Sequence, residues 1–261
     1  MSHPIRRGGR WRKRWTYVAA FADELMVCAA RIEVGPFGQT FWGILDRRSG
    51  ELLDRTRTRL PGTRGEVQGD ARVIVIRAAD AAGTLRFGSG KAIEVTCATG
   101  EGGEVWTRKR AGVPVACDLR AGSRHWQVGA MGVTDETVGY HPHHTVWSWS
   151  AGVGATASGD RVGWNLVEGI NDPPSGSERA IWISGEPAEP GPVAFDGLEG
   201  IRFEDGSSLA FTAEAERHNQ ESRLGISSAY RQPFGTFTGT LPGGVTLASG
   251  LGVMEHHDAT W

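Results

Sequence analysis

Short apolar runs closed by turn residues constrain the fold of this chain more than any other feature. The runs are roughly four to eight residues long and recur about every ten residues, as the strands of a β-sandwich or barrel do. Examples are "RVIVIR", "KAIEVTC" and "HTVWSWS". The 38 glycines fit this pattern, because tight turns need positive φ angles that glycine adopts without strain. We therefore expect an all-β protein.

Helical periodicity is weak throughout, and the best helical candidate is the short segment 134–139. Both halves of the chain hold a similar number of apolar runs, and a turn-rich join lies at residues 111–123. We expect a basic flexible leader at residues 1–14, followed by two antiparallel β-barrel-like units at 15–120 and 121–261. One continuous sandwich is the alternative.

The charge and apolar content of the chain narrow its possible partners. A formal net charge of -2 does not favour binding to nucleic acid. No apolar stretch approaches the roughly 20 residues that span a bilayer, and the arginine-rich start lacks the apolar core of a signal peptide. We expect a cytoplasmic protein that binds no nucleic acid and does not insert stably into a membrane.

Motifs for nucleotide cofactors and reactive nucleophiles are missing from the sequence. Neither GxGxxG nor Walker spacing occurs, and no GxSxG segment is present. The three cysteines stand at irregular spacing without CxxC, which indicates buried thiols in place of a disulfide framework or a zinc site. We therefore expect chemistry by side chains alone, without a cofactor.

The chain ends with "GVMEHHDATW", which sets four ionisable side chains into an apolar frame. Side chains alternate between the two faces of a strand, so Glu255 and His257 share a face with Val253, Ala259 and Trp261. That face is the apolar one, and we place Glu255 and His257 inside. A carboxylate next to an imidazole in a dry pocket is a proton-transfer pair. The alternative is a buried pair that only fixes the last strand in place.

The segment "YHPHHTVWSWSAG" brings histidines and tryptophans close together. Trp147 and Trp149 share a strand face, which suits a flat or polyene-like ligand and stabilises a passing cation. They would fill a core equally well. We expect His143 or His144 to act as a second proton carrier or hydrogen-bond donor.

A polar segment rich in Pro and Gly, residues 165–178, connects two aromatic runs. Asn165 and Glu178 stand at its ends, next to tryptophans, so we expect both at the mouth of a cavity. The segment is then either a lid or a plain surface connection. The second half is rich in tryptophan, and we add Trp164 and Trp261 to the predicted pocket wall.

Five segments of the second half resemble a known family: "YHPHHTVWSWSAG", "GWNLVEGINDPP", "SERAIWISGE", "YRQPFGTFTG" and "GVMEHHDATW". In this order they resemble the family called domain of unknown function 2804, which is distantly similar to lipocalin-like carotenoid hydratases, tocopherol cyclases and fungal Diels-Alderases. The opening "RWTYVAAFADELMVCAARIEVG" also looks like the first hairpin of the family. The family's terminal pattern is matched at Glu255, His257, Ala259 and Trp261. The sequence departs from it at His256 and Thr260.

The resemblance implies two consecutive lipocalin-like antiparallel β-barrel or sandwich units around an apolar cavity, with acid/base chemistry and no cofactor. Three functions stay open. The first is a hydratase, dehydratase, isomerase or cyclase that acts on a lipophilic or aromatic small molecule, with Glu255 and His257 as its acid/base pair. The second is a carrier whose ionisable groups anchor the polar end of a lipophilic ligand. The third is a hydrolase or lyase with a metal held by His141, His143, His257 and Glu255.

Overall fold

The computed structural model describes residues 3–59, 63–99, 102–223 and 226–261. These ranges contain strands and turns and no helix, so the all-β prediction is confirmed. Consequently, no helix in them is long and apolar enough to cross a membrane. The helical candidate 134–139 was wrong, because it lies inside a long strand.

Ten strands of the first half form one antiparallel sheet in the order β6-β5-β4-β3-β12-β11-β9-β8-β7, with β10 paired to β11. Their bounds are β3 (Lys13–Phe21), β4 (Leu25–Val34), β5 (Phe37–Asp46), β6 (Glu51–Arg59), β7 (Val67–Gly69), β8 (Val73–Arg77), β9 (Ala81–Phe87), β10 (Ile93–Thr99), β11 (Gly103–Ala121) and β12 (Arg124–Gly139). A separate two-stranded ribbon precedes this sheet, formed by β1 (Arg6–Arg7) and β2 (Arg10–Trp11).

Nine strands of the second half form another sheet in the order β16-β15-β14-β13-β21-β20-β19-β18-β17. Their bounds are β13 (His144–Thr156), β14 (Arg161–Glu168), β15 (Ala180–Ile183), β16 (Glu186–Ala188), β17 (Val193–Asp196), β18 (Gly200–Phe203), β19 (Ser208–Arg223), β20 (Ile226–Leu241) and β21 (Val245–Thr260).

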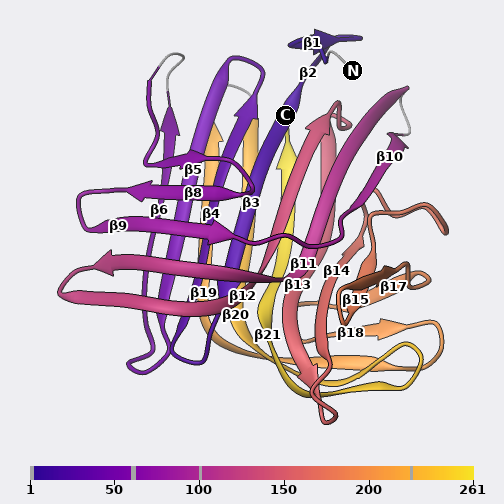
Figure 1. Cartoon of the computed structure of the whole chain (residues 1–261). Helices are drawn as coiled ribbons and strands as arrows, with labels where there is room; N and C mark the ends of the chain where they lie inside the picture. Colours follow the sequence, from indigo (N-terminus) through magenta and orange to yellow (C-terminus); the bar gives the residue numbers. More distant parts are fainter. Residues whose placement is uncertain (1–2, 60–62, 100–101, 224–225) are drawn as a thin grey trace.

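The first sheet curls because its longest strands bend and change neighbours along their length. The first part of β11 pairs with β10 and its last part with β9, and its register with β12 shifts between Ala111 and Val113. Gly112 has a φ of 68° at this bulge, a conformation that glycine adopts without strain. As a result, β8, β9 and the far ends of β11 and β12 lie across β3–β6 (Figure 1).

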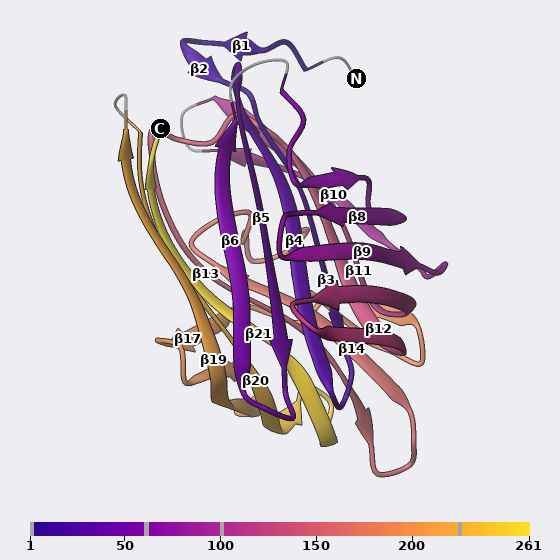
Figure 2. The ribbon, with the colours of Figure 1, turned by 90° about the vertical axis from the view of Figure 1, so that its left-hand side faces the viewer.

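Three hydrophobic cores fill the part of the molecule that the structure describes. The first sheet encloses a core around Trp42 and Leu85 on its concave side, and the second encloses one around Trp164 and Phe237. The opposite faces of the two sheets pack against each other through a third core. The strands β3–β6 and β19–β21 form two facing layers in Figure 2. Members of this shared core include Tyr17, Met26, Phe41, Trp149, Phe234 and Val253.

A bulge in β19 decides which of its side chains face the shared core. Before the bulge, the odd-numbered Leu209 and Phe211 belong to the core of the second sheet. The register with β20 shifts between Ala213 and Ala215, which inserts one residue and exchanges the two faces. The odd-numbered Arg217 therefore lies on the side of the first sheet.

Two predicted boundaries differ from the structure. The join expected at 111–123 is a hairpin within the first sheet, because β11 and β12 pair along almost their whole length. The chain passes between the sheets at 140–143 instead. Residues 1–2 of the expected flexible leader lie outside the described residues, but its remainder includes β1, β2 and the start of β3. The Tyr140 hydroxyl also donates a 2.6 Å hydrogen bond to the Pro4 carbonyl.

The close approach of β14 to the β11 bulge gives a stability prediction. A Cβ at Gly163 would lie 2.6 Å from the Gly112 nitrogen and 2.7 Å from the Ala111 carbonyl carbon, and backbone atoms cannot yield as side chains do. We expect Gly163→Ala to lower the free energy of unfolding in urea by about 1–3 kcal/mol. Gly129→Ala is the control, because a Cβ there meets nothing within 4 Å. Equal stability of the two variants would contradict this account of the sheet contact.

Candidate functional site

A cavity of about 110 Å³ lies between the two sheets. Residues of β3, β11 and β12 line it from the first sheet, and residues of β13, β19 and β21 line it from the second. The expected pocket inside a barrel is therefore not what the structure shows, because each sheet fills its own concave side with a core. A cavity of this size approaches the ~150 Å³ that admits a single benzene ring.

Aromatic rings form much of the cavity wall. Trp147, Trp149 and Trp261, three of the predicted wall residues, all line it. Tyr17 packs edge-on against Trp149 with 5.2 Å between ring centres. Behind the wall, the Lys13 ammonium lies 4.6 Å from the centre of the Trp261 ring. Such a wall fits the flat face of an unsaturated molecule.

Glu255 presents a buried carboxyl to the cavity. Its side chain comes from β21, between the buried Val253 and the partly buried His257, and the residue is 8% exposed. The Trp147 indole donates to one carboxyl oxygen and the Gln232 amide to the other, each at 2.9 Å. Burial raises the pKa of Glu255 to about 7, even though these two hydrogen bonds act to lower it. The carboxyl is thus held in place and titrates near neutrality.

His257 lines the same cavity but is not hydrogen-bonded to Glu255 in the described structure. Its Nε2 shares a 2.7 Å hydrogen bond with the Ser228 hydroxyl, and its ring lies 4.2 Å from the Trp147 ring, centre to centre. Burial lowers the pKa of His257 to about 3, so the ring is neutral at physiological pH. The two side chains share a face, as alternation along the strand predicts, without forming a direct pair.

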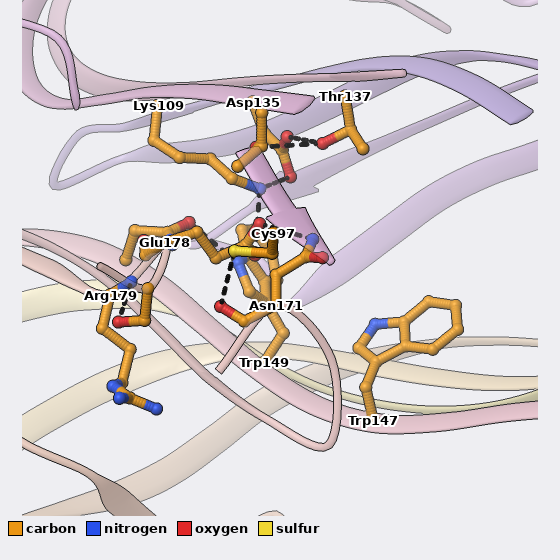
Figure 3. Close-up of polar contacts among 12 residues, drawn as sticks. Cys97, Lys109, Asp135, Thr137, Trp147, Trp149, Asn171, Glu178 and Arg179 are labelled. Atoms are coloured by element: carbon orange, nitrogen blue, oxygen red, sulfur yellow. Dashed lines mark hydrogen bonds and ion pairs between the residues drawn. The ribbon is translucent and has the colours of Figure 1, made fainter. Parts of the chain in front are cut away.

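A buried ion cluster occupies another part of the cavity wall (Figure 3). The Lys109 ammonium lies 2.6 Å from an Asp135 oxygen and 3.2 Å from a Glu178 oxygen. The Asn171 amide donates to the other Glu178 oxygen at 2.9 Å. Burial raises the pKa of Glu178, and the Lys109 charge opposes it only in part. Lys109 is itself buried, yet the two carboxylates raise its pKa, so it stays charged.

Four predicted site residues do not line the cavity. His143 is exposed, and His144 is 58% exposed with its Nε2 2.8 Å from Asp258 on the outer face of the sheet. Trp164 pairs with Gly152 in the neighbouring strand, which turns its ring into the core of the second sheet. Asn165 is buried behind the wall, where it accepts from the Trp149 indole at 2.9 Å.

Asn165 nevertheless supports the site from behind. Its amide donates to the Glu178 backbone carbonyl at 2.8 Å, so it links Trp149 to the ion cluster. Of the two residues expected at the cavity mouth, only Glu178 reaches the cavity.

Several cavity residues escaped the sequence prediction. Lys109, Asp135, Tyr17 and Arg217 lie far from the terminal segment in sequence, and each sits in a strand without an unusual local pattern. Arg231, by contrast, is exposed and pairs with Glu216 at 2.7 Å. The alternation that places Glu255 inward does not reveal which side chains lie opposite it.

The structure offers no ligand set for the metal hypothesis. In the described part of the chain, no three His, Cys, Asp or Glu side chains gather as they would around a metal ion. His143 points to solvent and the His141 ring is buried against Trp15, with ring centres 4.9 Å apart. Only Glu255 and His257 of the expected ligands reach the cavity.

The raised pKa of Glu255 gives a pH prediction. The folded protein retains the Glu255 proton between pH 4.5 and about 7, where the unfolded chain releases it. The stability contributed by this proton is therefore present below pH 4.5 and is lost as the pH rises to 7. We expect wild type to lose about 3 kcal/mol relative to Glu255→Gln across this window.

Urea unfolding at a series of pH values measures this difference. Both proteins retain His141 and His257, whose pKa values burial lowers to about 3, so the acid sensitivity of these rings cancels. A stability difference that stays constant with pH would show that Glu255 ionises normally.

Comparisons with known proteins agree with this architecture. The structure is similar to an AttH-like protein from Nitrosomonas europaea, with a TM-score of 0.58, 14% identity, and 94% of this chain and 92% of that chain covered. Kievitone hydratase from Nectria haematococca gives a TM-score of 0.57 at 10% identity, with 95% and 88% covered. CghA with Sch210972 gives 0.55 at 11% identity, with the same coverage.

At these identities the likeness establishes the fold, and it confirms the expected two-unit, lipocalin-like architecture. No curated protein sequence matches the chain significantly. The family model described as domain of unknown function 2804 matches residues 93–261, so the opening segment compared above lies outside the match. Since the match covers more than half of the chain, this protein belongs to the domain of unknown function 2804 family.

Proposed function

We propose that this protein is an enzyme without an organic cofactor that moves protons on a largely apolar small molecule held between its two sheets. The observation that carries the proposal is the Glu255 carboxyl, which lines the cavity, is 8% exposed and has a pKa of about 7. Near neutral pH such a group is populated in both protonation states. It can therefore donate or accept a proton, as general acid/base catalysis requires.

The surroundings of Glu255 suit proton transfer. Trp147 and Gln232 fix both carboxyl oxygens, so the acid approaches a bound molecule in a defined direction. His257 lines the same side of the cavity as a neutral ring, because burial lowers its pKa to about 3. Trp147, Trp149 and Trp261 would hold an unsaturated frame and stabilise positive charge that develops on it.

The ion cluster tunes this centre from across the cavity. The Asp135 charge raises the pKa of Glu255 further, and an Asp135 oxygen lies 2.6 Å from the Lys109 ammonium. Glu178, whose pKa burial also raises, is a further carboxyl that lines the same cavity. Hydration, dehydration, isomerisation or cyclisation each need a proton delivered to or removed from carbon or oxygen, and this set supplies it.

The fold is compatible with such chemistry. One of the structures to which this chain is similar is named a hydratase, so the architecture accommodates addition or removal of water. At 10% identity, neither the substrate nor the catalytic residues of that hydratase can be assigned to this chain.

Glu255→Gln tests the proposal. Wild-type protein is incubated in deuterated water with a panel of apolar alkenes, enones and polyenes, and mass spectrometry follows deuterium uptake or a mass change of one water molecule. For any compound that wild type converts, we expect Glu255→Gln to lower the rate at least ~10²-fold, as loss of a general acid/base does. Quenching of tryptophan fluorescence by the same compound should persist.

His144→Ala serves as the matched control, because this histidine lies on the outer face of β13 with Asp258. We expect it to convert the compound at the wild-type rate. An unchanged rate in Glu255→Gln would remove this residue from the mechanism.

Ligand carriage without turnover is the second candidate function. Four buried polar atoms of cavity residues lack a hydrogen-bond partner within the described structure: the Tyr17 hydroxyl, Asn171 Oδ1, Arg217 Nε and the Trp261 indole nitrogen. Such atoms recognise the polar end of a ligand as well as they recognise a substrate. Saturable quenching by a compound that wild type never converts would favour the carrier.

A further inference from the structure

Arg217 is a buried cation whose hydrogen bonds are all long. The residue is 2% exposed and lines the cavity. Its Nη1 lies 3.4 Å from the Tyr230 hydroxyl, 3.5 Å from the Gln232 amide oxygen and 3.7 Å from the Cys28 sulfur. Its Nη2 lies 3.5 Å from the Thr56 hydroxyl. Hydrogen bonds from a guanidinium to an ionised partner are normally about 2.7–2.9 Å.

Other arginines of this protein are paired as expected. Arg231 donates a hydrogen bond to each carboxylate oxygen of Glu216 at 2.7 Å, and Arg47 binds Glu214 in the same way. For Arg217, the one carboxylate within ion-pair distance in the described structure is Asp54, which lies 3.5 Å from Nε without hydrogen-bond geometry. Asp54 is also 35% exposed. Of these three arginines, Arg217 is the least exposed and has the most distant carboxylate partner.

The Tyr17 hydroxyl interacts electrostatically with Arg217 and the Cys28 thiol at the cavity, and no nitrogen or oxygen of a described residue is its hydrogen-bond partner. Tyr17 is 5% exposed, and the Cys28 thiol near it is only a weak partner. An unpaired buried hydroxyl costs folding free energy. Two buried donors, one of them charged, therefore line the cavity without a strong acceptor.

The surroundings hold the guanidinium in this position. Phe41 lies below it, with the guanidinium carbon 4.2 Å from the ring centre. Gly43 in β5 leaves room for the arginine stem, because a Cβ there would lie 2.4 Å from Arg217 Cδ. The bulge in β19 turns the side chain toward the first sheet. The local structure thus keeps a poorly paired cation at the cavity in spite of its desolvation.

We propose that Arg217 and Tyr17 form a subsite for the carboxylate of a small molecule whose apolar part lies against the tryptophan wall. The inference rests on the proposed function insofar as it names the substrate class of the same cavity. A planar carboxylate offers two acceptor oxygens, which the guanidinium and the phenol hydroxyl can share. A neutral apolar molecule would leave both donors unpaired.

Binding of a carboxylate here would also act on Glu255. The positive charge of Arg217 lowers the pKa of Glu255. A bound anion cancels that effect, so Glu255 takes up a proton and is ready to act as an acid. Anion binding and loading of the acid are therefore coupled.

Benzoate and benzamide test the subsite, because they have nearly the same shape and differ in charge. Binding to the full-length protein is measured by isothermal titration calorimetry at pH 7 in two buffers of different ionisation enthalpy. We expect benzoate to bind at least tenfold more tightly than benzamide. We also expect benzoate binding to take up protons in wild type but not in Glu255→Gln.

Tyr17→Phe and Arg217→Gln should each weaken benzoate binding about tenfold or more and leave benzamide binding unchanged. Tyr17→Phe removes an unpaired hydroxyl, so its melting temperature should equal or exceed that of wild type, and it remains informative if Arg217→Gln does not fold. Arg231→Gln, a surface arginine on the same sheet, is the control and should bind benzoate as wild type does.

Equal affinity for the two probes, or tight benzoate binding in Tyr17→Phe, would overturn the subsite. Neither readout depends on turnover. If Tyr17→Phe and Arg217→Gln weaken benzoate binding while Glu255→Gln leaves conversion unchanged, the proposed acid/base function is wrong and the carboxylate subsite is supported. If conversion needs Glu255 but benzoate binds no better than benzamide, the enzyme stands and the subsite fails.

Discussion

The site depends on the packing of two curled sheets through their outer faces. Each sheet closes over a core of its own, so only the remaining faces are left for contact, and wide aromatic side chains keep them apart there. The resulting gap desolvates whatever titratable group lines it. This is why the pKa values of Glu255 and Glu178 are raised and why the pKa of His257 is lowered. The shifted pKa values are thus a property of the fold as much as of the residues.

The two buried cations of the cavity, Lys109 and Arg217, differ in how close their hydrogen-bond and ion-pair partners lie. Lys109 has two close carboxylates, whereas Arg217 has only long contacts. Glu255 is influenced by both regions, since Asp135 raises its pKa and Arg217 lowers it. The pKa of one central carboxyl therefore depends on charges in both regions of the cavity. A ligand that alters either region changes the acid strength of Glu255 without touching it.

The sequence predicts the architecture and part of the site, and the boundary between success and failure has a physical reason. A two-residue period is local, so it places Glu255, His257, Trp147 and Trp149 on the correct faces. The same rule applied to β14 would have turned Trp164 away, because its neighbour Asn165 faces the cavity side. The tryptophan-rich composition of the second half placed Trp164 in the predicted pocket wall, against the alternation of side chains along β14.

Long-range pairing is what the sequence does not reveal. Lys109 and Asp135 meet across β11 and β12. Arg217 of β19 packs against Gly43 of β5, a strand more than a hundred residues earlier in the sequence. The expected join at 111–123 was wrong for a related reason, since a tight turn within one sheet looks the same in sequence as a turn between two domains. Local patterns define strands and faces, and the packing of distant faces defines the chemistry.

The one-residue bulge in β19 has a consequence for how such proteins diversify. Sheet pairing on both sides of Ala213–Ala215 continues across it, so the strand tolerates a change in residue count there. Removing a single residue would exchange the two faces of the strand beyond the bulge. Arg217 would then point away from the cavity, and its even-numbered neighbours would point into it. Short insertions and deletions can therefore exchange the lining of the cavity in one step, while the scaffold around it stays intact.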